Sequence, residues 1–141
     1  PAAGPTADTN DTPEWNAFVE AYKKQEGAFP SPSLFAHAYY IGMKAALLAL
    51  EETGGKLDDD GANFRKVLSS LSFETPTGKV SLDKNRNAIA DIYLTEVTEG
   101  PDGNLLNKLI KVVPQVNQTL GIDEAEFLAL GAVSRENPSC P

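Results

Sequence analysis

The longest apolar stretch of the sequence, from Leu34 to Leu50, constrains the fold more than any other feature. It is interrupted by His37, Gly42 and Lys44, and it falls short of the roughly 18 or more consecutive apolar residues of a membrane span. The pattern predicts a soluble helix whose apolar residues cover most of its circumference, so neighbours should bury it on several sides. Such a helix is unusual in a small free-standing domain and normal at the centre of a larger α/β body.

Clear boundary signals frame this helix. The connector at residues 29–33, Phe-Pro-Ser-Pro-Ser, is stiff because each proline fixes its own φ and restricts the residue before it. Ser31 or Ser33 can cap the helix start, and Gly54-Gly55 should stop it near Glu52. The predicted helix therefore covers residues 34–52.

A shorter amphipathic helix precedes the connector. Residues 1–12 show no apolar periodicity and indicate a loop. Thr12 can cap the helix with Pro13 in its first turn, and Gly27 is expected to end it. Its apolar residues form one stripe at i, i+3, i+4 and i+7, namely Trp15, Phe18, Val19 and Tyr22.

The second half of the sequence predicts a third helix, two hairpins and a short last helix. Asp58-Asp59-Asp60 supplies caps for the third helix, whose apolar positions are Phe64, Val67, Leu68 and Leu71. Short apolar runs predict strands near residues 71–74, 80–82, 88–97 and 105–113, separated by polar turns. Asp123 can cap the last helix, which should run through Leu130.

The charge balance excludes some classes of partner. The chain has 20 acidic and 12 basic residues, for a formal net charge of −8. A nucleic-acid surface needs clustered Lys and Arg to neutralise phosphates, and docking on an anionic membrane needs the same. Neither kind of surface is expected here.

Groups for catalysis or metal binding are scarce. His37 is the one histidine, and within an apolar helix it is expected to be a hydrogen-bonded core or cleft-edge residue rather than a catalytic base. Asp58-Asp59-Asp60 lacks the alternating ligands and terminal Glu of a calcium loop, so helix capping explains it better. Cys140 is either an incidental tail thiol or half of a disulfide with a partner outside this sequence. We therefore expect no enzyme, metal or cofactor.

Aromatic residues gather where the central helix begins. Phe35, Tyr39 and Tyr40 follow directly after the stiff connector. Aromatic side chains at a helix start beside a rigid loop can line a ligand cleft, or they can pack the core. Both interpretations are open at the level of the sequence.

The order of the segments from Trp15 to Val116 is specific. The residues that carry it are Tyr22–Gly27, Pro32–Tyr40, Glu51–Gly55, Phe64–Leu68 and the hairpin Phe73–Asp83. This order resembles the last third of type I periplasmic solute-binding proteins of branched-chain amino-acid ABC transporters. Two departures point to a subgroup with its own ligand. Ile41-Gly42 follows Tyr40 where the family often has Asp-Ala, and the segment after Val116 extends beyond the common core.

The resemblance implies an α/β fold, with three helices followed by strand hairpins and a short terminal helix. The chain would be the carboxy-terminal part of a two-lobed protein whose lobes close over a small ligand. Residues 1–30 would end the second lobe, 31–90 would return into the first lobe, and 91–141 would hold the hinge strands and the carboxy-terminal segment. Most ligand-gripping residues of the family lie upstream of the position of Pro1.

The same resemblance implies the binding component of an ABC importer in the periplasm, with a membrane permease as partner. No export signal is visible at the start of the sequence. The ligand would be an amino acid, an amide or an aromatic carboxylate, and Phe35, His37 and Tyr40 are the candidates for cleft-facing residues. The isolated chain would expose sheet edges and apolar helix faces, so we expect it to dimerise. Two alternatives stay open, a ligand-sensing regulatory domain of this fold and an unrelated small α/β enzyme or interaction domain.

Overall fold

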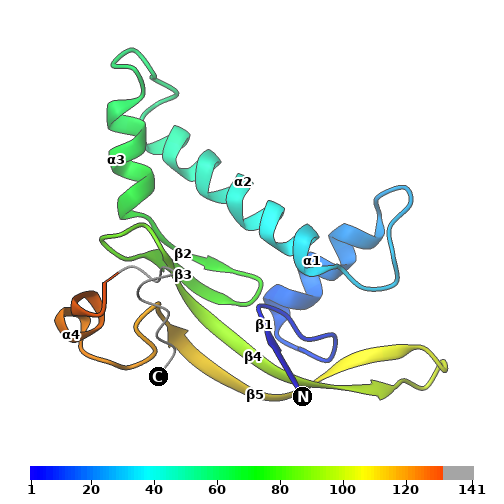
Figure 1. Cartoon of the computed structure of the whole chain (residues 1–141). Helices are drawn as coiled ribbons and strands as arrows, with labels where there is room; N and C mark the ends of the chain where they lie inside the picture. Colours follow the sequence, from blue (N-terminus) through cyan, green and yellow to red (C-terminus); the bar gives the residue numbers. More distant parts are fainter. Residues whose placement is uncertain (132–141) are drawn as a thin grey trace.

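A twisted antiparallel sheet carries the first three helices of the chain along one side, and the short last helix lies apart from them near the end of the last strand (Figure 1). The structure is a computed structural model and describes residues 1–131. The elements in chain order are β1 (Ala2–Gly4), α1 (Pro13–Lys23), α2 (Leu34–Glu52), α3 (Ala62–Ser70), β2 (Ser72–Thr75), β3 (Gly78–Leu82), β4 (Ala88–Glu99), β5 (Leu105–Val116) and α4 (Glu124–Ala129). This order confirms the predicted fold class, three helices followed by hairpins and a short terminal helix. Cys140 lies outside the described residues.

β4 is the central strand of the sheet. It pairs along most of its length with β5, and residues 93–95 also pair with β1 on the opposite edge. The beginning of β4 pairs with β3, and β2 pairs with β3, so every pairing is antiparallel. The sheet therefore links the amino-terminal residues to both hairpins.

A polar contact joins three strands where the β4–β5 ladder changes register, between Ala90 and Ile92. Gln115 has a φ of +49° at this irregularity. Its main-chain N–H and its side-chain amide donate to the Asp91 carboxylate at 2.9 and 3.1 Å, and the amide also donates to the Lys79 carbonyl at 3.0 Å. The interruption of the ladder is thus compensated by side-chain hydrogen bonds.

The predicted helix caps are confirmed. The Thr12 hydroxyl accepts from the Trp15 N–H at 3.3 Å, the Ser33 hydroxyl from the Ala36 N–H at 3.2 Å, and the Asp123 carboxylate from the Ala125 N–H at 2.9 Å. Before α3 the Asp59 carboxylate accepts from the Asn63 N–H at 2.7 Å, although Gly61 is the residue at the cap position. Gly54 and Gly55 follow α2 with φ of +61° and +73°, as a helix stop requires.

Two expected boundaries are wrong. Residues 1–12 contain the strand β1, which is too short to show an alternating pattern and exists through its pairing with β4. Gly27 does not end α1, because the helix stops at Lys23 and a further turn follows, closed by the bond from the Gln25 N–H to the Tyr22 carbonyl. Gly27 lies in the turn after that one, which is closed by the bond from the Ala28 N–H to the Gln25 carbonyl, and it has a φ of +73°.

The expected burial of α2 on several sides is also wrong for this chain. α3 packs against α2, and the ring of Tyr40 on α2 meets that of Phe18 on α1. His37 and Ala49 are the buried residues of α2. No other element of residues 1–131 lies on the outer side of the helix in Figure 1, so its large apolar side chains there stay exposed.

Candidate functional site

The start of α2 is held in place by the connector before it. The Ser33 side chain caps the helix, whereas the Ser31 hydroxyl donates to the Asp8 carboxylate at 2.5 Å. The other oxygen of Asp8 accepts from the Asn107 N–H at 2.7 Å, and the Asp8 N–H donates to the Asn107 carbonyl at 2.9 Å. Asp8 thus ties the connector and the loop before α1 to β5.

His37 is buried directly behind this helix start. Its side chain is 2% exposed, and its ring meets the rings of Trp15 and Phe18 edge-on, with centroids 6.1 and 6.0 Å apart. The His37 Nε2 lies 2.9 Å from the Thr77 hydroxyl oxygen. Burial lowers the pKa of His37 below its ordinary value, so the neutral imidazole is favoured. The expectation of a hydrogen-bonded core histidine matches this arrangement.

A short polar network extends from His37 into the sheet. Thr77 lies in the turn between β2 and β3, and its carbonyl accepts from the Tyr93 hydroxyl on β4 at 3.3 Å. Desolvation by burial raises the pKa of Tyr93, and the negative charge of Asp91 adds to that effect. The network therefore joins α2, the β2–β3 turn and β4 through uncharged groups.

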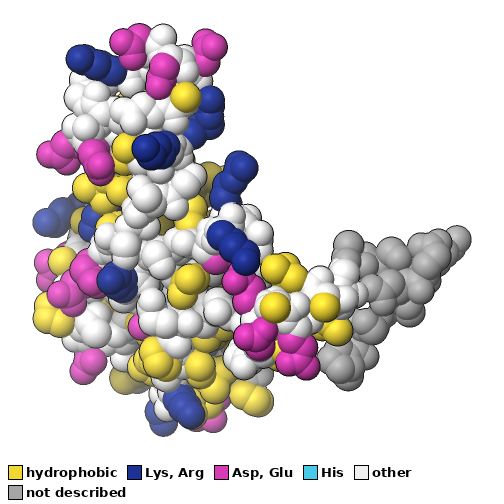
Figure 2. Space-filling model, turned by 90° about the vertical axis from the view of Figure 1, so that its left-hand side faces the viewer, with side chains coloured by type: hydrophobic (Ala, Val, Ile, Leu, Met, Phe, Trp, Pro, Cys, Tyr) yellow, Lys and Arg dark blue, Asp and Glu magenta, His cyan; other side chains and the backbone are white. Residues whose placement is uncertain are grey.

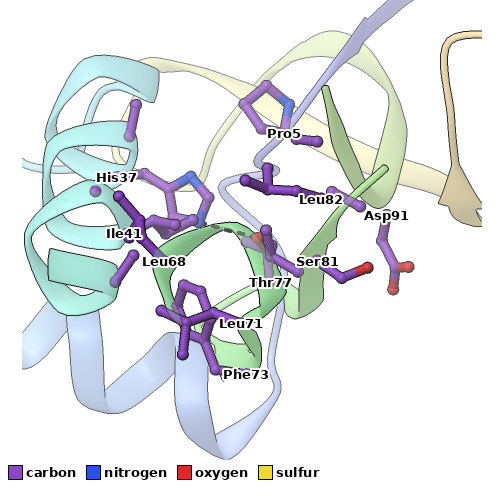
Figure 3. A pocket seen from close by; sticks show the side chains of 16 residues that line it. Pro5, His37, Ile41, Leu68, Leu71, Phe73, Thr77, Ser81, Leu82 and Asp91 are labelled. Atoms are coloured by element: carbon purple, nitrogen blue, oxygen red, sulfur yellow. Dashed lines mark hydrogen bonds between the residues drawn. The ribbon is translucent and has the colours of Figure 1, made fainter. Parts of the chain in front are cut away.

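An apolar hollow of about 370 Å³ lies next to this network, between α2, α3 and the sheet (Figure 3). Its apolar lining consists of Pro5, Ala38, Ile41, Gly42, Ala45, Leu68, Leu71, Phe73, Val80, Leu82, Ala88 and Ala90. The polar groups on its wall are His37, Thr77, Ser81 and Asp91. Because His37 and Thr77 bond to each other and the Asp91 carboxylate bonds to Gln115, the hollow suits apolar groups.

The three residues predicted to face a cleft do not converge on this hollow. Of the three, only His37 lines its wall. Phe35 points outward and is 67% exposed. Tyr40 packs its ring against Phe18, with centroids 5.0 Å apart, and lines a separate hollow of about 270 Å³ between α1, α2 and β2. The helix therefore presents these side chains in three directions.

Sequence reasoning missed the partners of these residues. Thr77 and Tyr93 are far from His37 in the sequence, and no spacing rule links a helix to the turn of a later hairpin. Asp8 lies in a segment predicted to be loop, and only its pairing with Asn107 reveals its place. A polar residue in an otherwise apolar helix was the one available signal, because a buried imidazole needs a partner.

Groups for metal binding are not assembled in the described part of the chain. Within residues 1–131, no cluster of three or more His, Cys, Asp or Glu side chains is placed to hold a metal ion. None of the helices in this range has the length and hydropathy to span a membrane. On the face shown in Figure 2, acidic and basic side chains are interspersed with several small apolar patches.

Comparison with known proteins identifies the family. The family profile described as periplasmic binding protein matches residues 2–104. The chain belongs to the periplasmic binding protein family. The match covers the hollow, the network around His37 and the whole of α2, whereas β5 and α4 lie after the matched range.

Relatives of this periplasmic binding protein chain fall into three groups. Leu/Ile/Val-binding protein homolog 6 of Brucella abortus is 34% identical over 104 residues, which cover 73% of this chain and 26% of that protein. The solute-binding protein of an ABC transporter from Rhodopseudomonas palustris BisB5, solved with 3,4-dihydroxybenzoic acid, is 29% identical with a TM-score of 0.70, over 82% of this chain and 31% of that one. Atrial natriuretic peptide receptor 2 of Anguilla japonica is 30% identical over 146 residues, covering 96% of this chain and 14% of the receptor.

The chain is much shorter than the proteins it matches. It spans about a quarter of the length of the Brucella relative and about a third of the Rhodopseudomonas structure. The homologous solute-binding proteins are binding proteins of ABC transporters rather than enzymes. What this chain contributes is therefore one portion of a binding-protein fold.

Proposed function

We propose that the chain is part of the extracytoplasmic substrate-binding component of an ABC importer, and that it takes no part in covalent chemistry. The observation that carries this proposal is the likeness in sequence and structure to the ligand-bound Rhodopseudomonas protein, with 29% identity and a TM-score of 0.70. A membrane permease would be its partner, and the periplasm its compartment.

The ligand belongs to the amino acids, amides or aromatic carboxylates. Two of these classes are supported by relatives, amino acids by the Leu/Ile/Val-binding protein homolog and aromatic carboxylates by the protein solved with 3,4-dihydroxybenzoic acid. Phe35 is the best candidate for a direct contact, because it is exposed at the start of α2 immediately after the connector. His37 and Tyr40 would position that helix start through Thr77 and Phe18.

The same proposal divides the chain between the two lobes of the complete protein. Residues 1–30 would belong to the second lobe, 31–90 to the first, and 91–141 to the hinge strands and the carboxy-terminal segment. Two features support it, the 12-residue strands β4 and β5, which pair with each other along most of their length, and the Ser31–Asp8 bond at the expected boundary. Ligand binding would close the lobes about these connections. The apolar hollow beside His37 would be filled in the complete protein by polypeptide outside this chain.

A sensory domain of the same fold is the second candidate. The match to a natriuretic peptide receptor over 96% of this chain favours it, because that relative is a receptor and not a transport protein. The two candidates differ in the rest of the polypeptide. A signalling module on the same gene favours the sensor, whereas a neighbouring permease gene favours the importer.

A thermal-shift screen of the intact protein against the three ligand classes tests the proposal. A ligand that binds only the folded state stabilises it by about 2.7 kcal/mol at a hundredfold excess over Kd. A hit within one class supports the binding function and names the class, and Phe35→Ala should then weaken binding more than Leu105→Ala. If the folded intact protein is shifted by none of the three classes, this ligand assignment is wrong.

A further inference from the structure

The β4–β5 ladder gains a residue just beyond the part of β4 that pairs with β3. Ala90 pairs with Val116 and Ile92 pairs with Val113, so β4 advances by two residues while β5 advances by three. An extra residue on one strand of an antiparallel pair is left outside the ladder, bends its strand and increases the local twist. The direction in which β4 and β5 continue is therefore decided at this point.

The backbone of β5 does not hold this bend by itself. Pro114 has no N–H to donate to the ladder. Gln115 has a φ of +49°, in the left-handed region that a residue with a side chain seldom adopts. Such a conformation persists only where the surrounding contacts determine it. The bend therefore depends on the contacts that Gln115 makes.

Asp91 supplies those contacts. Its Oδ1 accepts from the Gln115 N–H at 2.9 Å and from the Gln115 side-chain amide at 3.1 Å, and this amide also donates to the Lys79 carbonyl at 3.0 Å. The other oxygen, Oδ2, lies against Gly78, where an added Cβ would come within 2.7 Å of it. The carboxylate thus occupies space that glycine leaves open and joins β5 to the start of β3. We define these four residues as the Asp91 clasp; they all belong to this chain, so their contacts do not depend on polypeptide outside it.

We propose that the Asp91 clasp sets the angle at which the hinge strands β4 and β5 leave the first lobe, and that Asp91 is a positioning residue for ligand binding. This inference rests on the proposed function, in which the first lobe ends at residue 90 and the hinge strands begin at residue 91. Gly78 and Lys79 lie on the first-lobe side of that boundary, whereas Asp91 and Gln115 lie on the hinge side. The clasp is thus a contact through which the first lobe holds the hinge.

A fixed angle favours ligand binding because it limits the arrangements that the open protein samples. The apparent affinity for a ligand falls in proportion to the fraction of molecules in the binding-competent arrangement. Without the clasp, the extra residue of β5 has no fixed conformation, and the lobes sample a wider range of angles. Loss of the clasp should therefore weaken binding through the lobe angle, without removal of a ligand contact.

Two substitutions at Asp91 separate the acceptor oxygen from the negative charge. Asp91→Asn removes the charge but keeps an Oδ1 that can accept both Gln115 bonds. Asp91→Ala removes the acceptor. A clasp that acts through hydrogen-bond geometry should survive the first change and fail in the second. Gln115→Gly is a further variant, which tolerates the positive φ and removes the side-chain amide.

A distance measurement between two spin labels tests the angle in the intact protein without ligand. Lys66→Cys on α3 and Lys108→Cys on β5 place the labels at exposed residues on either side of the clasp, in a background without other cysteines. Asp91→Ala should broaden or shift the distance distribution, Gln115→Gly should do so to a smaller extent, and Asp91→Asn should leave it unchanged.

Circular dichroism verifies that the labelled variants are folded, and Gln115→Gly decides by the same criterion if Asp91→Ala does not fold. An unchanged distribution in Asp91→Ala, or equal broadening in Asp91→Asn, would overturn the proposal.

Affinity for L-leucine and for 3,4-dihydroxybenzoate is the second readout on the same variants. Asp91→Ala should weaken binding of whichever compound binds the wild type by roughly fivefold or more, the lower end of typical coupling between distant sites, and Asp91→Asn should not. A changed distance distribution with unchanged affinity would contradict the positioning role. Binding of neither compound would count against the ligand assignment of the proposed function, whereas the distance distribution would still decide whether the clasp sets the angle.

Discussion

The two sides of α2 differ in burial although they belong to one helix. On the inner side, His37 is 2% exposed and hydrogen-bonded to Thr77, against the rings of Trp15 and Phe18. On the outer side, Phe35, Tyr39, Met43 and Leu47 are 67, 80, 61 and 58% exposed, because no element of residues 1–131 covers them. The inner side is explained by contacts within this chain, whereas the outer side requires a surface from elsewhere.

The comparison shows that apolar character alone does not decide which side of a helix a given chain buries. The inner side meets α1, α3 and the β2–β3 turn, and it provides both an apolar surface and a hydrogen-bond partner. Large side chains on the outer side contribute to the stability of this chain only when a partner removes them from water. Substitutions on the two sides should therefore differ sharply in their effect on folding.

The largest effect is expected at Trp15. Trp15→Ala removes a fully buried ring between Phe18 and His37 and should lower the free energy of unfolding by about 3–5 kcal/mol. Urea denaturation followed by circular dichroism measures it. Trp15→Phe, which keeps a ring at the site, should recover a large part of the loss. A loss below about 1 kcal/mol for Trp15→Ala would mean that the inner side is not the core.

Loss of the partner of His37 should come next. Thr77→Val keeps the shape of the side chain but leaves the buried imidazole nitrogen unpaired, at a cost of about 1–3 kcal/mol. Thr98→Val is the matched control, because the Thr98 side chain makes no hydrogen bond within the described residues. Equal stability of the two variants in urea would show that the His37–Thr77 bond contributes nothing.

Lowering the pH should reduce the folding stability of the chain through His37 on the inner side of α2. Its pKa is lowered by burial in the folded chain, so the unfolded chain binds more protons as pH falls below the ordinary value of 6.5. Stability should therefore decrease as pH is lowered from 6.5 toward the depressed pKa. Urea midpoints measured from about pH 8 to about pH 5 should show this dependence. His37→Gln should reduce it, and an unchanged slope in that variant would contradict the assignment.

The smallest effect is expected on the outer side. Tyr39→Ala removes a side chain that is 80% exposed and should change the free energy of unfolding of the dilute chain by less than about 0.5 kcal/mol. The same urea titration applies. A loss comparable to that of Trp15→Ala would mean that the Tyr39 side chain is already buried by this chain.

Local signals made most of the fold predictable. Thr12, Ser33 and Asp123 cap their helices as predicted, because an N-cap acts over three residues and is readable from the sequence. The strands β2–β5 appear near their predicted positions, with boundaries shifted by one to three residues. β1 was missed because three residues carry no period, and its existence depends on a partner strand about 90 residues away.

The candidate site was predictable only in part. The apolar surroundings of His37 in the sequence predict that it is buried and hydrogen-bonded. Its partner Thr77 could not be predicted, because the contact depends on how the β2–β3 turn meets α2. Phe35 and Tyr40 were grouped because they are close in the sequence, and helical geometry separates them by more than a quarter of a turn. The lobe assignment and the ligand-facing role of these residues stay predictions.

Hydroxyl-radical labelling of the wild-type chain in dilute solution tests the difference between the two sides of α2 most directly. Met43 and Trp15 are both readily oxidised. Met43 reports on the outer side of α2, and Trp15 reports on the core against its inner side. We predict that Met43, which is 61% exposed, is labelled readily, while Trp15, which is 1% exposed, is protected. Protection of Met43 in the dilute chain, or labelling of Trp15 at a similar rate to Met43, would contradict the account.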